Sequence, residues 1–318
     1  MELVQNFWEK YDITVQKIEL LRHNENMTYR VTAVEGEYVL RIHKPVDTMN
    51  LSLLSGSMKA EELISGEMNL LEYLDKQSEL GTQAPVKNKA GSLVTKVGEY
   101  QGTLIRWISG ECLVKELVTV ACAEQIGRML AKIHNALDRY KGLSRYSYRQ
   151  DLVERMISFY HDTLKHSTIE AEQLEIIGQM LEKIKAMLDE NNDDMIVVHN
   201  DLGESNLLVS EENIVPIDFS LSGICVREMD LASLYCHFES SKIREAILTG
   251  YQGVALHKVC EQRIDICIGY QVLIFIFSQF QAIQSQGWFK EALGYWCEEI
   301  LGKILQGQKI QSEIGLYS

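Results

Sequence analysis

Hydrophobic and polar residues alternate along the first part of the chain, which is the pattern of strands with one buried face. The alternation covers residues 13–21, 27–34 and 38–42. Glu35 and Gly36 form a predicted turn between the last two strands, and residues 4–11 have the spacing of a short amphipathic helix. The chain is therefore expected to open with an antiparallel sheet.

Between residues 59 and 75 the spacing of the apolar residues changes to that of a helix. The stripe consists of Leu63, Leu70, Leu71 and Leu74. Two more strands are predicted over residues 83–95 and 98–108, with Pro85 restricting the start of the first. The helix is expected to cover one face of the sheet.

The remainder of the chain is predicted to be mainly helical. Helical spacing covers residues 118–137, 146–191 and 227–317. The most apolar stretch, residues 264–283, contains Asp265 and three glutamines. A membrane span needs ~20 mostly apolar residues, so this stretch predicts a buried helix. The acidic run at 189–194 indicates a solvated helix end, with a cation-attracting cluster as the alternative.

Composition favours a two-lobed protein and excludes several classes of function. A chain of 318 residues, 46% hydrophobic and 24% charged, can bury a large core. The formal net charge of −14 argues against nucleic-acid binding, because neutralising phosphates requires a basic surface. Seven cysteines without a C-x-x-C pair predict neither a zinc site nor a disulfide framework. The first residues lack the features of a signal peptide, so we expect a cytoplasmic protein.

The candidate chemistry is concentrated in residues 195–223. His199, Asp201 and Asn206 form the pattern H-x-D-x-x-x-x-N, and Asp218 follows in a second apolar run. The apolar runs predict a loop followed by a hairpin, which would bring Asp201, Asn206 and Asp218 to one mouth. Phosphoryl transfer uses one carboxylate to orient the acceptor hydroxyl and separate hard oxygen ligands for a metal ion. Asp201 suits the first role, and Asn206 and Asp218 suit the second. The alternative is a set of ordinary polar loop residues.

This stretch resembles the signature of the aminoglycoside phosphotransferase and choline kinase superfamily, whose fold is similar to that of protein kinases. The signature commonly reads HGDLHPGN followed by IDF or IDW, and this chain reads HNDLGESN followed by IDFS. The matching positions are His199, Asp201, Leu202 and Asn206; the departures are Asn200, Gly203, Glu204 and Ser205. The resemblance implies a two-lobed α+β fold, with a sheet lobe at residues 1–108 and a mainly helical lobe at 109–318.

The resemblance also implies a nucleotide site. Arg41, at the end of the third strand, is expected to contact the α- and β-phosphates, for which a planar guanidinium is suited. Glu67 on the following helix is expected to pair with Arg41, because Glu61 and Glu62 lie too early in that helix. A surface arginine on an edge strand is the alternative for Arg41.

Two further segments are assigned to the nucleotide by resemblance. The connection at residues 22–26, which includes Asn26, is expected to lie over the phosphates, although it contains no glycine. Residues 103–110 resemble the hinge whose backbone faces adenine, so Arg106 and Ile108 are assigned to the nucleotide site. An ordinary hairpin loop and a plain edge strand are the respective alternatives.

Three other polar residues are expected to support the site. His199 would hold the loop by hydrogen bonding, and His134, on a helix resembling the family's LGxxLAxLH segment, would be structural. Asp230 resembles the aspartate of the family's D-L-A segment, and at the start of an apolar helix it would act as an N-cap.

We therefore expect transfer of the γ-phosphoryl group of ATP, with Mg²⁺, to a hydroxyl of a small molecule; GTP is not excluded. An amine on the acceptor would suit the acidic protein, with a neutral sugar or a zwitterion as the alternative. A protein kinase is disfavoured, because the chain has no glycine-rich loop or A-P-E segment and Asn200 replaces the HRD arginine. A catalytically silent kinase-like protein is disfavoured because Asp201, Asn206 and Asp218 are all present. Neither a nucleic acid nor a membrane is expected as a partner, and the oligomeric state is open.

Overall fold

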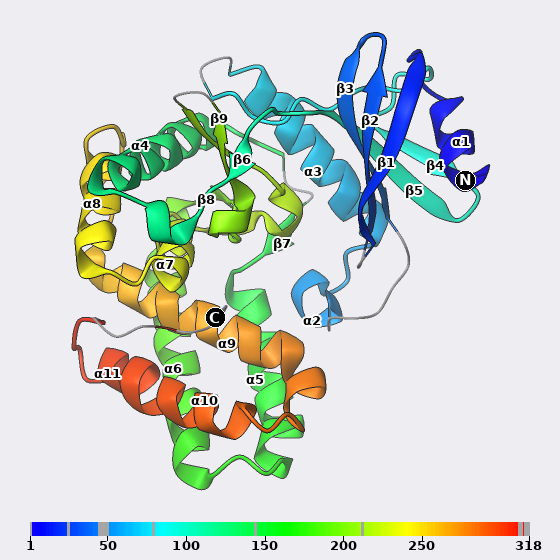
Figure 1. The fold of residues 1–318 in the computed structure, drawn as a ribbon. Helices are drawn as coiled ribbons and strands as arrows, with labels where there is room; N and C mark the ends of the chain where they lie inside the picture. Colours follow the sequence, from blue (N-terminus) through cyan, green and yellow to red (C-terminus); the bar gives the residue numbers. More distant parts are fainter. Residues whose placement is uncertain are drawn as a thin grey trace.

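The computed structural model describes residues 2–23, 26–43, 51–77, 80–142, 145–210, 213–310 and 314. A small antiparallel sheet lies beside a larger, mainly helical part (Figure 1). This arrangement confirms the predicted α+β fold, with the sheet formed by the first part of the chain and most helices by the rest.

The small part contains a five-stranded sheet in the order β1-β2-β3-β5-β4, in which all neighbours are antiparallel. Its strands are β1 (Val15–His23), β2 (Asn26–Ala33), β3 (Gly36–His43), β4 (Val94–Val97) and β5 (Tyr100–Arg106). Gly36 closes the β2–β3 turn with a φ of 138°, a backbone conformation that residues with a Cβ rarely adopt. The three strands predicted from alternation are confirmed.

The two faces of this sheet are covered by different helices. Tyr38, Leu40 and Ile42 of β3 pack with α1 (Glu2–Trp8) in one apolar cluster. The intervening residues of β3 point to the opposite face, because successive side chains of a strand alternate. That face lies against α3 (Ala60–Asp75), which buries the predicted leucine stripe. Arg41 is therefore directed between the sheet and α3.

The strand predicted over residues 83–95 is mostly absent from the described chain. Pro85 makes only an isolated bridge to Ile105, and β4 begins at Val94. The intervening chain folds back on itself, because the side chain of Asn88 accepts hydrogen bonds from the backbone N–H of Ala90 and of Ser92 at 3.0 Å each. A side chain that satisfies nearby backbone groups competes with strand pairing.

The larger part is built mainly from helices. They are α2 (Leu51–Ser55), α4 (Val120–Leu137), α5 (Gln150–Asp162), α6 (Ala171–Glu190), α7 (Glu228–His237), α8 (Ser241–Gln252), α9 (Glu261–Ile283), α10 (Phe289–Tyr295) and α11 (Gly302–Leu305). A π-helical segment, Trp296–Leu301, joins the last two.

Helix α9 forms the centre of the larger core, packing against α6 and α7. It is long and apolar enough to cross a membrane by length and composition, but 72% of its most apolar window is buried inside the protein. Its apolar character is thus accounted for by burial against the neighbouring helices.

Short strands position the predicted loop and hairpin. They are β6 (Glu111–Cys112), β7 (Tyr146–Ser147), β8 (Met195–Val198), β9 (Leu207–Ser210), β10 (Asn213–Pro216) and β11 (Gly223–Val226). Strands β9 and β10 pair as an antiparallel hairpin, β6 joins β9, and β8 pairs with β11. The hairpin predicted after the loop is confirmed. Through β6, the chain that leaves the small sheet attaches to the larger part.

Candidate active site

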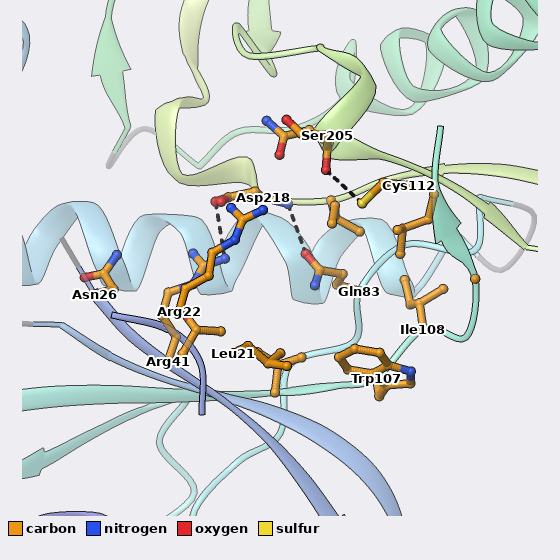
Figure 2. A pocket seen from close by; sticks show the side chains of 16 residues that line it. Leu21, Arg22, Asn26, Arg41, Gln83, Trp107, Ile108, Cys112, Ser205 and Asp218 are labelled. Atoms are coloured by element: carbon orange, nitrogen blue, oxygen red, sulfur yellow. Dashed lines mark hydrogen bonds and ion pairs between the residues drawn. The ribbon is translucent and has the colours of Figure 1, made fainter. Parts of the chain in front are cut away.

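A pocket of about 520 Å³ lies between the small sheet and the larger part (Figure 2). Its walls come from β1, β2 and β3, from the chain that follows β5, and from the loop and hairpin of the larger part. The lining residues are Leu21, Arg22, Asn26, Thr28, Val39, Arg41, Gln83, Trp107, Ile108, Gly110, Cys112, Ser205, Asn206, Leu208, Ile217 and Asp218. Thus the pocket brings together the residues predicted for metal and phosphate binding.

The loop after β8 is held by a buried aspartate, Asp230. Its carboxylate accepts hydrogen bonds from the backbone N–H of His199 at 2.9 Å and of Asn200 at 2.7 Å. The imidazole Nε2 of His134 lies 2.9 Å from the same carboxylate. Asn200 has a φ of 66°, a strained conformation that asparagine tolerates better than most residues. Three contacts to one carboxylate therefore fix the backbone that leads into Asp201.

Asp230 has a different local role from the one predicted. It lies inside α7, and Arg227 occupies the N-cap position of that helix. The expectation of an N-cap is therefore wrong, whereas the expected support of the loop is confirmed. Burial acts to raise the pKa of Asp230, but the hydrogen bond and charge of His134 outweigh it, with His199 and the Asn200 N–H, and the pKa is lowered. His134 is structural, as predicted.

His199 connects the loop to the segment that carries Asp218. Its Nε2 lies 3.0 Å from the carbonyl oxygen of Ile217, so this nitrogen donates the hydrogen bond. Its Nδ1 accepts the backbone N–H of Asp201 at 3.3 Å, and its ring packs against Phe219 with centroids 4.4 Å apart. The imidazole is buried and has both nitrogens engaged. This is the supporting position predicted for His199.

Asp201, the predicted base, does not itself line the pocket but is hydrogen-bonded to Asn206, which does. The side-chain amide of Asn206 donates to Asp201 Oδ2 at 2.9 Å and to the Asp201 carbonyl oxygen at 2.8 Å. Burial raises the pKa of Asp201, and the nearby carboxylate of Asp218 adds to the increase, while His199 opposes it. A raised pKa makes a carboxylate a better proton acceptor when it is ionised.

Asp218 lines the pocket, and its charge acts on the carboxyl group of Asp201. It has a φ of 63°, and its backbone N–H donates to the side-chain oxygen of Gln83 at 3.2 Å. Arg41 Nη2 lies 3.2 Å from Asp218 Oδ1, and this oxygen is buried and accepts no hydrogen bond from the described residues. Burial acts to raise the pKa of Asp218, but Arg41, Ser220 and His199 together outweigh it and the pKa is lowered. The carboxylate is thus held ionised.

Arg41 and Glu67 form the ion pair that the sequence predicts. Arg41 Nη1 donates to Glu67 Oε1 at 2.9 Å, and the two residues are 7% and 3% exposed. The other two glutamates of α3 are engaged elsewhere, because Glu61 pairs with Lys96 and Glu62 caps its own helix through the N–H of Lys59. Arg41 therefore bridges two carboxylates, one from each part of the protein.

Of the three other residues assigned to the nucleotide, two line the pocket and one does not. Asn26 and Ile108 line the pocket, whereas Arg106 is exposed and does not. Arg106 pairs with Tyr38 across the sheet, and its guanidinium lies 6.0 Å from the centre of that ring. Paired residues point to the same face, so Arg106 lies on the face covered by α1 and not on the face of Arg41. Of the connection at residues 22–26, positions 24 and 25 lie outside the described residues.

The pocket also contains residues without an individual assignment from the sequence, among them Gln83, Trp107 and Arg22, of which the last two belong to segments that were assigned to the nucleotide. Gln83 reaches Asp218 across 135 positions of sequence, and no local pattern marks such a contact. Trp107 forms part of the wall, with the guanidinium of Arg30 4.3 Å from its ring centre. Arg22 lies at the end of β1 and is the third.

The donor set suits a hard divalent cation. The side chains of Asn206 and Asp218 offer amide and carboxylate oxygens, which are ligands that Mg²⁺ prefers, and the buried Asp218 Oδ1 without a hydrogen bond is a suitable donor. Mg²⁺ in such sites typically takes its other ligands from phosphate and water. No group of three or more His, Cys, Asp or Glu side chains suited to a metal occurs within the described ranges.

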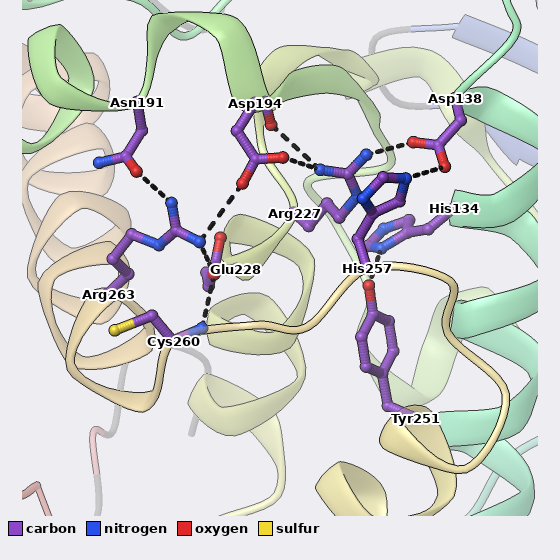
Figure 3. Close-up of polar contacts among 10 residues, drawn as sticks. All are labelled: His134, Asp138, Asn191, Asp194, Arg227, Glu228, Tyr251, His257, Cys260 and Arg263. Carbon is purple, nitrogen blue, oxygen red and sulfur yellow. Dashed lines mark hydrogen bonds and ion pairs between the residues drawn. The ribbon is translucent and has the colours of Figure 1, made fainter.

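A polar cluster supports the start of β8 (Figure 3). Arg227 donates to Asp138 and to Asp194, and Arg263 Nη2 lies 3.3 Å from Asp194 and 2.8 Å from Glu228. Asp194, at the end of the acidic run, is therefore ion-paired and only partly exposed. The cluster ties the helices α4, α7 and α9 to the strand that leads into the catalytic loop.

A small antiparallel sheet beside a helical part, with Arg41 and Asp218 in contact at the pocket between them, is the arrangement of a protein-kinase-like phosphotransferase. The profile of the Phosphotransferase enzyme family matches residues 17–261. The chain belongs to that family. It matches no individual curated protein sequence.

Solved structures with the same fold align with nearly the whole chain. An amicoumacin kinase in complex with AMP-PNP, Ca²⁺ and Ami has a TM-score of 0.73 at 15% identity, covering 98% of this chain and 95% of that one. A microcompartment-associated aminopropanol kinase has a TM-score of 0.71 at 18% identity, covering 97% and 98%. The choline kinase of Streptococcus pneumoniae has a TM-score of 0.63 at 16% identity, covering 95% and 100%. At these identities the likeness shows the fold.

Proposed function

We propose that this phosphotransferase moves the γ-phosphoryl group of ATP, with GTP as the alternative, to a hydroxyl group of a small molecule. One observation carries the proposal. Asn206, Asp218 and Arg41 line one pocket, where Asp201 is hydrogen-bonded to Asn206 and Glu67 is paired with Arg41. This arrangement supplies one proton acceptor, two hard oxygen donors and one phosphate-binding cation.

Each residue has a distinct part in the proposed reaction. Asp201 accepts a hydrogen bond from the acceptor hydroxyl and takes its proton as the oxygen attacks phosphorus. Its raised pKa and the hydrogen bond from Asn206 suit this role. Asn206 and Asp218 would hold Mg²⁺, which when bound neutralises charge on the phosphate oxygens. Arg41 binds the phosphates, and Glu67 fixes the guanidinium.

The other assignments concern the nucleobase and the lobes. The backbone near Ile108 is the proposed contact for the base, and Asn26 lies at the proposed phosphate end of the pocket. Arg106 is withdrawn from this set because its side chain lies on the other face of the sheet. We set the boundary between a nucleotide-binding lobe and a catalytic lobe at residues 108–109, after the end of β5.

The acceptor is proposed to be a small hydroxyl compound that carries an amine. The net charge of −14 favours association of cations at low salt. Two structural neighbours point the same way, since one is an aminopropanol kinase and the other a choline kinase. We propose a cytoplasmic enzyme that acts on neither nucleic acid nor membrane.

ADP release tests the proposal directly. The purified protein is given Mg-ATP and a panel that matches amino alcohols with neutral alcohols of the same carbon skeleton, at low and high salt. We expect acceptor-dependent ADP release with at least one amino alcohol, and none with the Asp201→Asn variant. Turnover confined to neutral or anionic alcohols, without salt dependence, would contradict the amine. Mg-nucleotide binding without turnover on any acceptor would favour the catalytically silent alternative.

A further inference from the structure

Arg22 enters the pocket through an irregularity in the sheet. The register of β1 against β2 shifts between Leu20 and Arg22, so Leu21 is an extra residue relative to the partner strand. Neighbouring residues of a regular strand point to opposite faces, yet Leu21 and Arg22 both line the pocket. A bulge of this kind redirects side chains and is over-represented next to functional sites. The shifted register therefore explains why Arg22 faces the pocket.

Arg22 also shares a cross-strand row with Arg41. Arg22 pairs with Thr28, Thr28 pairs with Arg41, and all three line the pocket. Directly paired residues of an antiparallel sheet point to the same face. Both arginine side chains accordingly extend from the sheet toward Asp218 in Figure 2.

The two arginines differ in whether nearby carboxylates neutralise their charge. Arg41 is within 3.2 Å of both Glu67 and Asp218, so this group of three carries a formal charge of −1. Arg22 is exposed, and within the described chain it has no recorded hydrogen bond or ion pair. Among the described lining residues, Arg22 and Arg41 are the only cations. Within the described part of the chain, Arg22 is thus the pocket cation without a carboxylate partner.

The sequence around Arg22 lacks the glycines of a turn that binds phosphates through its backbone N–H groups. A glycine-rich turn can approach phosphates with its N–H groups because it has no Cβ atoms in the way. No glycine occurs from Leu21 to Thr28. A guanidinium provides several N–H donors in a planar fork that matches phosphate oxygens, and it projects beyond the backbone.

We infer that Arg22 binds the β- and γ-phosphoryl oxygens of the nucleotide, replacing with a side-chain cation the contacts of a glycine-rich turn. The inference rests on the proposed function, because it requires a nucleoside triphosphate in this pocket. It assigns a second phosphate-binding arginine to the site. Arg41 acts from within the ion-paired cluster, and Arg22 acts from the open end of β1.

The test compares ligands that differ only in phosphate number. Calorimetry measures the affinities of ATP, ADP, AMP and adenosine, with Mg²⁺, for the wild type, Arg22→Ala and Arg22→Lys. Loss of a charged hydrogen-bonding group should weaken ATP by about 10- to 100-fold. ADP should weaken less, and AMP and adenosine should be unchanged. Arg22→Lys should fall between, because a point charge keeps the attraction but loses the fork.

Lys17→Ala is the matched control. Lys17 lies on the same strand with a side chain 64% exposed, outside the pocket, so its removal tests for a general effect of charge. We expect ATP affinity like that of the wild type. Unchanged ATP affinity in Arg22→Ala, or an equal loss for ATP and adenosine, would overturn the assignment of Arg22. A wild type that binds neither these four ligands nor GTP would instead contradict the proposed function, which is a separate result.

Discussion

Asn206 Nδ2 donates to Asp201 Oδ2 at 2.9 Å, which joins the proposed base to a proposed metal ligand. An amide whose nitrogen is engaged in this way offers its oxygen to a cation. The same side chain can therefore orient the carboxylate of Asp201 and bind metal. This explains in physical terms why an asparagine suits position 206: an aspartate there would place a second negative charge against Asp201.

Replacing Asp201 with asparagine should abolish turnover while leaving nucleotide affinity intact. The amide keeps the shape of the carboxylate but cannot take the proton of the acceptor hydroxyl. Loss of a positioned base is expected to lower kcat by ~100-fold or more. Steady-state kinetics and calorimetry with Mg-ATP measure the two quantities, and Asp193→Asn, at an exposed aspartate, is the control. Undiminished turnover in Asp201→Asn would remove Asp201 from the reaction.

The rate should fall on the acid side before nucleotide binding does. The pKa of Asp201 is raised by burial, so the base becomes protonated at a pH above the ordinary aspartate value of about 3.9. The pKa of Asp218 is lowered, since Arg41, Ser220 and His199 together outweigh its burial, and its carboxylate stays ionised to lower pH. As pH falls, kcat should therefore decrease while Mg-ATP binding persists. Parallel loss of both would mean that Asp201 does not control the acid limb.

Asp218→Ala should remove binding of the metal–nucleotide complex more than binding of the free nucleotide. A cation that bridges phosphate oxygens loses its carboxylate ligand in this variant. Calorimetry with ATP in the presence of Mg²⁺ and in the presence of a chelator separates the two effects. Equal affinity for Mg-ATP in the variant and the wild type would show that the metal is held elsewhere.

The sequence predicted the parts of the site that depend on local order, and it missed those that depend on distant contacts. Arg41 and Glu67 could be paired because strand alternation and helical spacing determine which way each side chain points. Arg106 was misassigned because neighbouring residues of a strand point to opposite faces of the sheet. Which residues of β5 share a face with Arg41 depends on how β5 pairs with β3, and the local sequence does not specify that register. Gln83 meets Asp218 through tertiary packing alone, and the bulge that redirects Arg22 becomes visible only in the strand register.

Arg41→Ala should weaken ATP more than adenosine and should also destabilise the fold. Removing the arginine leaves Glu67 as a buried charge without its partner, a change that costs about 3 kcal/mol. The double variant Arg41→Met with Glu67→Leu should recover much of this stability, because well-packed apolar residues can replace a buried ion pair. ATP affinity should remain low in both. Recovery of ATP affinity together with stability would mean that Arg41 is structural and does not bind phosphate.

Asp230→Asn should loosen the catalytic loop, because an amide cannot accept from all three donors that now meet the carboxylate. The backbone N–H groups of His199 and Asn200 and the imidazole of His134 converge on it, and its NH₂ group would face one of them. We expect a loss of about 3 kcal/mol in the free energy of unfolding, together with lower kcat.

The pH dependence of that loss identifies its electrostatic part. The folded pKa of Asp230 is depressed, since His134, His199 and the Asn200 N–H together outweigh burial. The stabilisation is therefore present above the unfolded pKa of about 3.9 and is lost as pH falls through the folded value. Urea unfolding of the wild type and Asp230→Asn at neutral pH, near pH 5 and near pH 3 measures the difference in stability. It should be constant at the two higher values and smaller at the lowest. A difference in stability that already shrinks between neutral pH and pH 5 would point instead to titration of a histidine. A difference that persists undiminished to the lowest pH at which the protein folds would mean that hydrogen-bond geometry matters more than the charge of Asp230.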